Sequence, residues 1–216
     1  MDLFDHLPPH PDSARLTLAP GAVLLRGWAR EADVAQLQAV EAVIAQAPLR
    51  HMQTPGGYTM SVATTSCGAL GWVSDPRGYR YAAHDPHTNQ PWPAMPDCLL
   101  TLAQAAAAEA GYGNFRPEAC LINQYLPGAK LSLHQDKDEK DLSAPIVSVS
   151  LGLSAVFLFG TPVRKDRPQR YRLVHGDVVV WGGPSRLLFH GVLPLADGAH
   201  TLVGRRRLNV TFRKVG

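Results

Sequence analysis

The sequence predicts a mainly β protein with flanking helices, whose core is a double-stranded β-helix, or jelly roll. Two observations carry this prediction. Signals for short strands recur at close intervals from Ala119 to the end of the 216-residue chain, whereas both segments with helical spacing come earlier. Recurring short strands are typical of two packed antiparallel sheets. The length is ample to bury a hydrophobic core in one compact domain.

Two helices are expected before the strand-rich part. The segment from Glu31 to Ala47 is rich in Ala, contains no Gly or Pro, carries apolar residues at helical spacing, and is ended by Pro48. The segment from Met95 to Gly111 has Pro96 near its first turn and Gly at its end, where a helix stops. Residues 52–93 between them are rich in Gly, Pro, Tyr and Trp, which indicates either a mobile lid or an irregular structural excursion.

Three later segments show the period of two that strands require. Residues 147–154 alternate apolar side chains with Ser and Gly. In residues 119–125, Asn123 and Tyr125 share one face. In residues 207–213 one face is apolar and the other carries two guanidinium groups with an amide between them: Leu208, Val210 and Phe212 against Arg207, Asn209, Thr211 and Arg213.

Composition sets mild limits on location and partners. The net charge of +3 and the pI of about 8.9 permit contact with nucleic acid without demanding it. The three cysteines are odd in number and scattered, which indicates free thiols in a reducing compartment. The N-terminus lacks the pattern of a signal peptide, and no run of about 18 apolar residues occurs. A soluble cytoplasmic protein without a membrane segment is expected.

The string His-x-Asp occurs three times, although the 9 His and 18 acidic residues predict only about one such string by chance. His10-Pro11-Asp12 lies among prolines, where no rigid strand would hold ligands in register. His175-Gly176-Asp177 precedes a β-branched run and is interpreted as a turn that enters a buried strand. His134-Gln135-Asp136 ends an alternating segment and precedes the charged residues 137–141, as at the mouth of a pocket.

A metal site is one interpretation of His134 and Asp136. Side chains two apart in a strand point to the same side, so both can serve as ligands. A second imidazole from His190 would complete two His and one carboxylate, the set associated with non-heme Fe(II) oxygenases because it leaves positions open for reactants. On position alone, a non-metal role stays equally open.

The polar face of residues 207–213 is a candidate socket for a diacid. Two Arg on the inner side of a sheet would be costly unless they met anions, and the guanidinium of Arg207 or Arg213 suits a carboxylate bidentately. Asn123 and Tyr125 could serve the same anion. The alternatives are a solvated outer face with a basic tail for the arginines, and an ordinary polar sheet face for Asn123 and Tyr125.

These motifs together resemble the AlkB family of Fe(II)/2-oxoglutarate-dependent nucleic-acid dealkylases. The resemblance extends from about Gly21 to Arg213. It is carried by an ordered series of motifs: Thr54-Pro55-Gly56-Gly57-Tyr58-Thr59-Met60-Ser61-Val62, Gly71-Trp72, Asn123-x-Tyr125, Pro127-Gly128, His134-x-Asp136-x-Asp138-Glu139, His190-Gly191 and Arg207-x-Asn209-x-Thr211-Phe212-Arg213. A series in order is far more specific than any one motif.

The resemblance implies roles for individual residues. It implies iron ligands at His134, Asp136 and His190. It implies that 2-oxoglutarate is bound by Arg207 and Arg213, supported by Asn123, Tyr125 and Asn209. It implies substrate contacts from lid aromatics, a carboxylate, one arginine and a loop that grips the nucleotide backbone: Trp72, Tyr79, Tyr81, Asp138, Arg164, Thr54, Tyr58 and Met60. Thr64, Leu158 and the pair Leu188-Phe189 depart from the family pattern and bear on base preference and lid closure.

The resemblance also implies an organisation and an activity. Residues 1–20 are expected to be a flexible N-terminus, 21–118 helices and a nucleotide-recognition lid, and 119–216 the jelly-roll catalytic core. The implied reaction uses Fe(II), O2 and 2-oxoglutarate to demethylate bases such as 1-methyladenine or 3-methylcytosine in DNA, preferably single-stranded, or in RNA. It releases formaldehyde, succinate and CO2 and repairs alkylation damage. A flipped-out base is the expected partner and a monomer the expected state.

Two other functions stay open at this point. A 2-oxoglutarate-dependent oxygenase acting on a protein or lipid would keep the metal ligands and arginines but would not need the lid aromatics. A non-enzymic nucleic-acid-binding module would bind methylated oligonucleotides in the presence of chelators and release no formaldehyde.

Overall fold

The structure, a computed structural model, describes residues 15–216. The helices are α1 (Asp33–Gln46), α2 (Asp97–Glu109) and two short 3-10 turns, η1 (Arg30–Ala32) and η2 (Gly183–Ser185). The strands are β1 (Arg15–Ala19), β2 (Ala22–Leu25), β3 (Arg50–Gln53), β4 (Thr59–Gly68), β5 (Gly71–Asp75), β6 (Gly78–Ala82), β7 (Ala119–Tyr125), β8 (Leu131–His134), β9 (Ile146–Gly152), β10 (Ala155–Thr161), β11 (Gln169–Leu173), β12 (Val178–Trp181), β13 (Phe189–Val192) and β14 (Arg207–Arg213).

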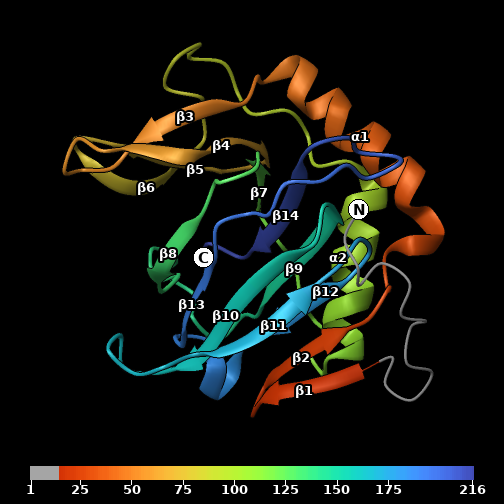
Figure 1. Cartoon of the computed structure of the whole chain (residues 1–216). Helices are drawn as coiled ribbons and strands as arrows, with labels where there is room; N and C mark the ends of the chain where they lie inside the picture. The colour runs from red at the N-terminus through yellow and green to blue at the C-terminus, as the bar shows by residue number, and fades with distance from the viewer. Residues whose placement is uncertain (1–14) are drawn as a thin grey trace.

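Two antiparallel sheets form the jelly roll that the sequence predicts (Figure 1). The larger has eight strands in the order β1-β2-β12-β9-β14-β7-β4-β3, and the smaller has four in the order β11-β10-β13-β8. Side chains from both sheets pack between them, among them Trp181 of the larger sheet and Phe157 and Phe159 of the smaller. The crossing connections place β14 in the centre of the larger sheet, between β9 and β7.

Both predicted helices are confirmed, with ends that differ by a few residues from the expected ones. They cover the outer face of the larger sheet, where Val40 of α1 and Leu99 of α2 pack on Val149 and Val210 of the central strands. Gly111 follows α2 with a φ of 94°, a conformation that favours glycine and ends the helix. The apolar stripe of each helix therefore finds its partner on the sheet.

The segment between the helices contains four strands, so it is not wholly irregular. β3 and β4 extend the larger sheet at one edge, and β5 and β6 form a separate hairpin beside them (Figure 1). β1 and β2 occupy the opposite edge of the same sheet. The hairpin thus lies at the end of the jelly roll that also carries β8 in Figure 1.

The structure differs from the predicted chain organisation in two respects, at β1 and at residue 119. Residues 1–14, with the string His10-Pro11-Asp12, lie outside the described residues. Arg15–Ala19, within the range expected to be flexible, forms β1 and pairs with β2. The larger sheet takes four of its strands from before residue 119. Cys67, Cys98 and Cys120 are free thiols, as predicted, and no helix among residues 15–216 is long and apolar enough to cross a membrane.

Candidate active site

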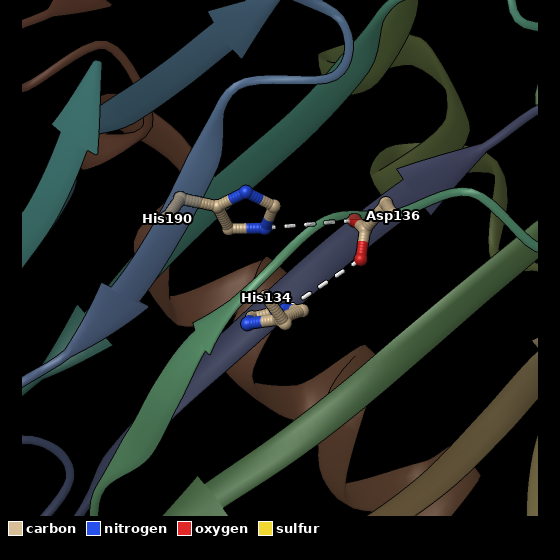
Figure 2. A group of neighbouring side chains, drawn as sticks. All are labelled: His134, Asp136 and His190. Carbon is tan, nitrogen blue, oxygen red and sulfur yellow. Dashed lines mark ion pairs between the residues drawn. The ribbon is translucent and has the colours of Figure 1, made fainter. Parts of the chain in front are cut away.

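Two histidines from paired strands and one carboxylate meet at the β8 edge of the smaller sheet (Figure 2). His134 ends β8 and lies directly opposite His190 of β13 in the strand register. Asp136 follows β8, with Oδ1 3.6 Å from Nε2 of His134 and Oδ2 3.8 Å from Nε2 of His190. All three ligand atoms lie within 4.8 Å of one another, so the group could hold one metal ion.

Backbone carbonyls set the tautomers of both imidazoles. Nδ1 of His134 lies 2.9 Å from the carbonyl of Ser132, and Nδ1 of His190 lies 3.1 Å from the carbonyl of Leu188. Because a carbonyl oxygen only accepts hydrogen bonds, each Nδ1 carries the proton in the neutral ring. The lone pair is then on Nε2, which faces Asp136. This is the arrangement that orients histidines for metal binding.

Electrostatics favour the ligand forms of these groups. Burial opposes ionisation of Asp136, but Arg213, His190 and His134 together outweigh burial and hold the pKa of the carboxyl well below its usual range. Burial lowers the pKa of His190 to about 3, and the neighbouring His134 adds to this effect. An ionised carboxylate and a neutral imidazole are the forms that bind a divalent metal. The donor set is the one used by non-heme Fe(II) oxygenases.

The predicted diacid socket has one cation with unused donors. Arg207 is 1% exposed, and its guanidinium lies over the ring of Tyr125, 5.0 Å from the ring centroid. Nη2 donates to Oγ of Ser150 at 3.0 Å. Among residues 15–216, neither Nε and Nη1 of Arg207 nor the Tyr125 hydroxyl has a hydrogen-bond partner. Buried polar groups of this kind are costly, so this cluster fits a carboxylate that would accept from all three.

Arg213 is placed differently from Arg207. Its Nε and Nη2 donate to Oδ2 of Asp136 at 3.0 and 2.7 Å, so the guanidinium contacts the carboxylate of the His–Asp–His group directly. The alternative of a solvated outer face for β14 is wrong, because Arg207 and Arg213 are both buried. The strand lies in the middle of the sheet, and its polar face points between the two sheets.

The supporting amides lie on the same face as the arginines. Asn123 is directly opposite Asn209 across β7 and β14, and Tyr125 is directly opposite Arg207. Nδ2 of Asn209 donates to Oγ of Ser148 at 2.7 Å and to the carbonyl of Val149 at 3.0 Å. Asn209 therefore links β14 to β9 on the face of the sheet that carries the arginines.

Three lid aromatics lie on the β5–β6 hairpin, next to the segment that follows Asp136. Trp72 and Tyr79 stack with ring centroids 5.5 Å apart. Nε1 of Trp72 donates to Oδ2 of Asp138 at 3.1 Å. The Tyr81 hydroxyl donates to Oε1 of Glu139 at 2.5 Å. The hairpin is therefore tied to the chain just beyond the metal-ligand string.

The remaining predicted substrate residues are exposed or half-buried and lie outside the His–Asp–His group. Thr54 and Tyr58 close a turn before β4, in which the Tyr58 backbone N–H donates to Oγ1 of Thr54 at 3.2 Å. Tyr58 is 78% exposed. Met60 is half-buried in β4, and Arg164 is exposed in the loop after β10.

Sequence reasoning assigned no role to two buried charges at the site. Glu139 and Arg186 form an ion pair of 3.0 Å with side-chain exposures of 2% and 3%. Glu139 belongs to the charged residues 137–141, which the sequence places at the mouth of a pocket, and nothing in the local pattern indicates that this one side chain is buried. Ser148 and Ser150 were also missed as partners, although their alternation along β9 places them on the inner face.

Comparisons with known proteins agree with this geometry. The profile of the 2OG-Fe(II) oxygenase superfamily matches residues 21–213. The chain is 59% identical over 197 residues to the alpha-ketoglutarate-dependent dioxygenase AlkB of Salmonella typhimurium, over 91% of each chain. It is 56% identical over 216 residues to the protein of the same name from Escherichia coli, over 100% of this chain and 98% of that one.

Solved structures show the same fold. The structure of OsALKBH1 matches with a TM-score of 0.80 and 29% identity, over 93% of this chain and 99% of that chain. A 2OG-Fe(II) oxygenase family oxidoreductase from Burkholderia pseudomallei matches with a TM-score of 0.54 and 19% identity, over 91% of this chain and 88% of that chain. With its profile match and its relatives both spanning most of the sequence, the chain belongs to the AlkB family of 2OG-Fe(II) oxygenases.

Proposed function

We propose that this protein demethylates N-alkylated bases of nucleic acids oxidatively, using Fe(II), O2 and 2-oxoglutarate, and that it repairs alkylation damage. The observation that carries the proposal is the juxtaposition of the His–Asp–His group with a buried arginine, Arg207, whose Nε and Nη1 have no hydrogen-bond partner among residues 15–216. More distant relatives are named for nucleic-acid demethylation: a tRNA demethylase of Schizosaccharomyces pombe at 32% identity over 68% of this chain, and a DNA N(6)-methyladenine demethylase of Arabidopsis thaliana at 41% over 45%.

His134, Asp136 and His190 would hold the iron through two Nε2 atoms and one carboxylate oxygen. Bound Fe(II), together with 2-oxoglutarate and O2, supplies the oxidation that hydroxylates an N-methyl group and yields succinate and CO2, after which the hydroxymethyl group leaves as formaldehyde. The protein keeps both imidazoles in the ligand tautomer by way of their Nδ1 bonds. Trp181 and Phe157 pack against the ring of His190 and exclude water from that side.

Arg207 and Tyr125 would hold the far carboxylate of 2-oxoglutarate. Nε and Nη1 of Arg207 and the Tyr125 hydroxyl offer three donors with no partner within residues 15–216. Asn123 and Asn209 would support this end from the neighbouring strand positions. Arg213 would keep Asp136 ionised and present a positive charge to the end of the cosubstrate nearer the metal.

The β5–β6 hairpin would cover the substrate base. Trp72 and Tyr79 offer a stacked aromatic surface, and the Asp138 carboxylate beside them suits a cationic methylated base. Tyr81 would hold the hairpin in place through Glu139. Thr54, Tyr58, Met60 and Arg164 would contact the nucleic acid around the flipped base. Single strands should be the easier substrate, because flipping a base out of a duplex costs a few kcal/mol.

The proposal extends to the state in which the protein works. Action as a monomer is carried over from the sequence prediction. The location in the cytoplasm, where nucleic acid is accessible, follows the sequence prediction and is part of the proposal.

The test is incubation of the purified protein with Fe(II), ascorbate, 2-oxoglutarate and a panel of methylated single-stranded DNA and RNA oligonucleotides. Mass spectrometry of the bases and a formaldehyde assay should both report demethylation, and the His134→Ala variant is the matched inactive control. Succinate formation with no change in any base would favour a protein or lipid substrate. Oligonucleotide binding without succinate or formaldehyde would favour a non-enzymic module.

A further inference from the structure

Glu139 is a buried carboxylate at the site to which the proposed reaction gives no chemical task. Its side chain is 2% exposed and contacts three partners. Oε1 accepts from the Tyr81 hydroxyl at 2.5 Å, and Oε2 accepts from Nη2 of Arg186 at 3.0 Å. Nε of Arg213 lies 3.4 Å from Oε1. One carboxylate therefore joins the lid hairpin to two buried arginines.

The hairpin reaches this segment through two residues that lie side by side. Trp72 and Tyr81 are directly opposite each other in the β5–β6 register. They donate to Asp138 and Glu139, which are consecutive in the chain. The outer contact, from Trp72, ends at an exposed carboxylate, whereas the contact from Tyr81 ends at a buried one. Only the contact from Tyr81 therefore connects the hairpin to buried charged groups.

Both arginines that bind Glu139 also bind Asp136. Nη1 of Arg186 donates to the Asp136 backbone carbonyl at 2.6 Å. Arg213 donates to Oδ2 of Asp136 through Nε at 3.0 Å and Nη2 at 2.7 Å. The backbone and the carboxylate of Asp136 are thus each held by a cation that Glu139 also holds. In a buried network of this kind, one lost partner changes the bonds of the others.

Glu139 and Asp136 compete for Arg213. Nε of Arg213 is 0.4 Å closer to Oδ2 of Asp136 than to Oε1 of Glu139, and the Tyr81 hydroxyl occupies Oε1. If the hairpin moves away, Oε1 loses this donor and becomes a stronger acceptor for Arg213. The guanidinium is then drawn from Asp136 and from the end of the cosubstrate site near it.

We propose that Glu139 is a positioning residue that couples the β5–β6 hairpin to the Asp136–Arg213 pair, so that a closed hairpin and a bound 2-oxoglutarate favour each other. This inference rests on the proposed cosubstrate site but not on the chemical class of the substrate. Coupling of binding equilibria is reciprocal, so 2-oxoglutarate must hold the hairpin closed as strongly as the closed hairpin tightens 2-oxoglutarate.

The test is amide hydrogen exchange of the Fe(II)-loaded protein under nitrogen, with and without saturating 2-oxoglutarate, and it needs no nucleic acid. In the wild-type protein, 2-oxoglutarate should slow exchange in residues 71–82 by about fivefold or more, the lower end of typical coupling. Tyr81→Phe removes only the hydroxyl and should reduce this ratio to less than about twofold. The matched control is Tyr112→Phe, which removes a hydrogen bond to the Gly21 carbonyl that joins none of the residues of this network, and it should keep the wild-type ratio.

A second variant separates coupling from simple bracing. Glu139→Gln keeps an acceptor of the same shape for Tyr81 but loses the charge that competes for Arg213. It should lose the 2-oxoglutarate-dependent protection of residues 71–82. A bracing residue would instead raise exchange equally with and without 2-oxoglutarate and leave the ratio intact. A wild-type ratio in both Tyr81→Phe and Glu139→Gln, or no protection in the wild-type protein despite 2-oxoglutarate binding, would overturn the inference. Loss of oligonucleotide demethylation alone would bear only on the proposed function.

Discussion

The strings His134-Gln135-Asp136 and His175-Gly176-Asp177 have the same spacing and opposite environments. Nε2 of His134 faces a carboxylate beyond hydrogen-bond distance, at 3.6 Å. Both ring nitrogens of His175 are already used: Nδ1 accepts from the Gly152 N–H at 2.9 Å, and Nε2 donates to Oδ2 of Asp33 at 3.0 Å. The first string therefore keeps a lone pair for a metal, and the second has none to offer.

The two carboxylates differ in the same way. Asp136 binds a side chain, Arg213, in addition to facing two imidazoles. Asp177 accepts from the backbone N–H groups of Gly27 and Val174 and from Arg26, so it joins the turn to the chain after β2. Interpretation of the second string as a turn is confirmed. The lesson is that spacing selects candidates, whereas the partners of the second nitrogen and of the carboxylate decide between a ligand and a brace.

The largest expected effect separates the two strings by activity. His134→Ala or Asp136→Ala should abolish demethylation and sharply reduce iron content while the fold stays intact, because a ligand is lost at the pocket mouth. His175→Ala should keep iron and activity per folded molecule. Iron by elemental analysis and formaldehyde release are the measurements. Iron loss in His175→Ala, with retention in His134→Ala, would reverse the assignment.

Loss of an arginine of the candidate site should weaken 2-oxoglutarate binding, whereas loss of the arginine that pairs with Asp177 should not. Arg207→Ala and Arg213→Ala should each weaken 2-oxoglutarate binding by roughly 3 to 5 kcal/mol, because a buried charge loses its partner. Arg26→Ala, which removes the cation paired with Asp177, should leave 2-oxoglutarate binding unchanged. Calorimetric titration of the metal-loaded proteins gives the affinities. Unchanged affinity in both site variants would remove the diacid socket.

The Asp177 carboxylate in the turn should matter for the stability of the fold rather than for the reaction. Asp177→Asn should lower the free energy of unfolding by about 2 to 3 kcal/mol, because an amide group then faces buried N–H donors. Asp197→Asn is the control. The side chains of Asp197 and Arg205 are 62% and 67% exposed, so their ion pair should contribute little to stability. Denaturant titrations measure both. Equal small losses in the two variants would show that the turn does not depend on the Asp177 charge.

The middle residues of the strings offer a matched pair of substitutions. Gly176 has a φ of 85°, and a Cβ there would lie 2.5 Å from Cγ of Arg30, so Gly176→Ala should cost about 1 to 3 kcal/mol of stability. Gln135→Ala loses one partly exposed hydrogen bond to the Leu187 carbonyl and should cost about 1 kcal/mol or less. A larger loss of stability in Gln135→Ala than in Gly176→Ala would contradict the comparison.

A further expected effect is a gradual pH dependence of the stability of the metal-free protein. Burial lowers the pKa of His190 to about 3 from an ordinary value of 6.5. The unfolded chain therefore binds a proton at this residue between pH 6.5 and 3 that the folded chain does not bind. Stability should fall as pH falls below 6.5, by at most about 1.4 kcal/mol per pH unit. His190→Asn should flatten this slope, and an unchanged slope in thermal unfolding would contradict burial of a neutral imidazole.

Several elements could be predicted because their causes are local. The helices follow from apolar periodicity and from Pro and Gly at their ends, and the two faces of β14 follow from alternation. The His134 string was found among three by the strand before it and the charges after it. Local pattern could not show whether the polar face of β14 met solvent, because strand periodicity reports two faces and not what covers each one.

Position in the tertiary structure decided the rest. His190 joins His134 only because β13 pairs with β8 across 56 residues of chain. Glu139 resembles its charged neighbours in the sequence. It can be buried because Arg186 and Arg213, from distant parts of the chain, pair with its carboxylate and offset the cost of desolvation. The donors of Arg207 face the interior because β14 lies between β9 and β7. Period and end signals are properties of a short stretch of chain, whereas a ligand set, a buried ion pair and a cosubstrate socket require groups that only the crossing connections of the sheets bring together.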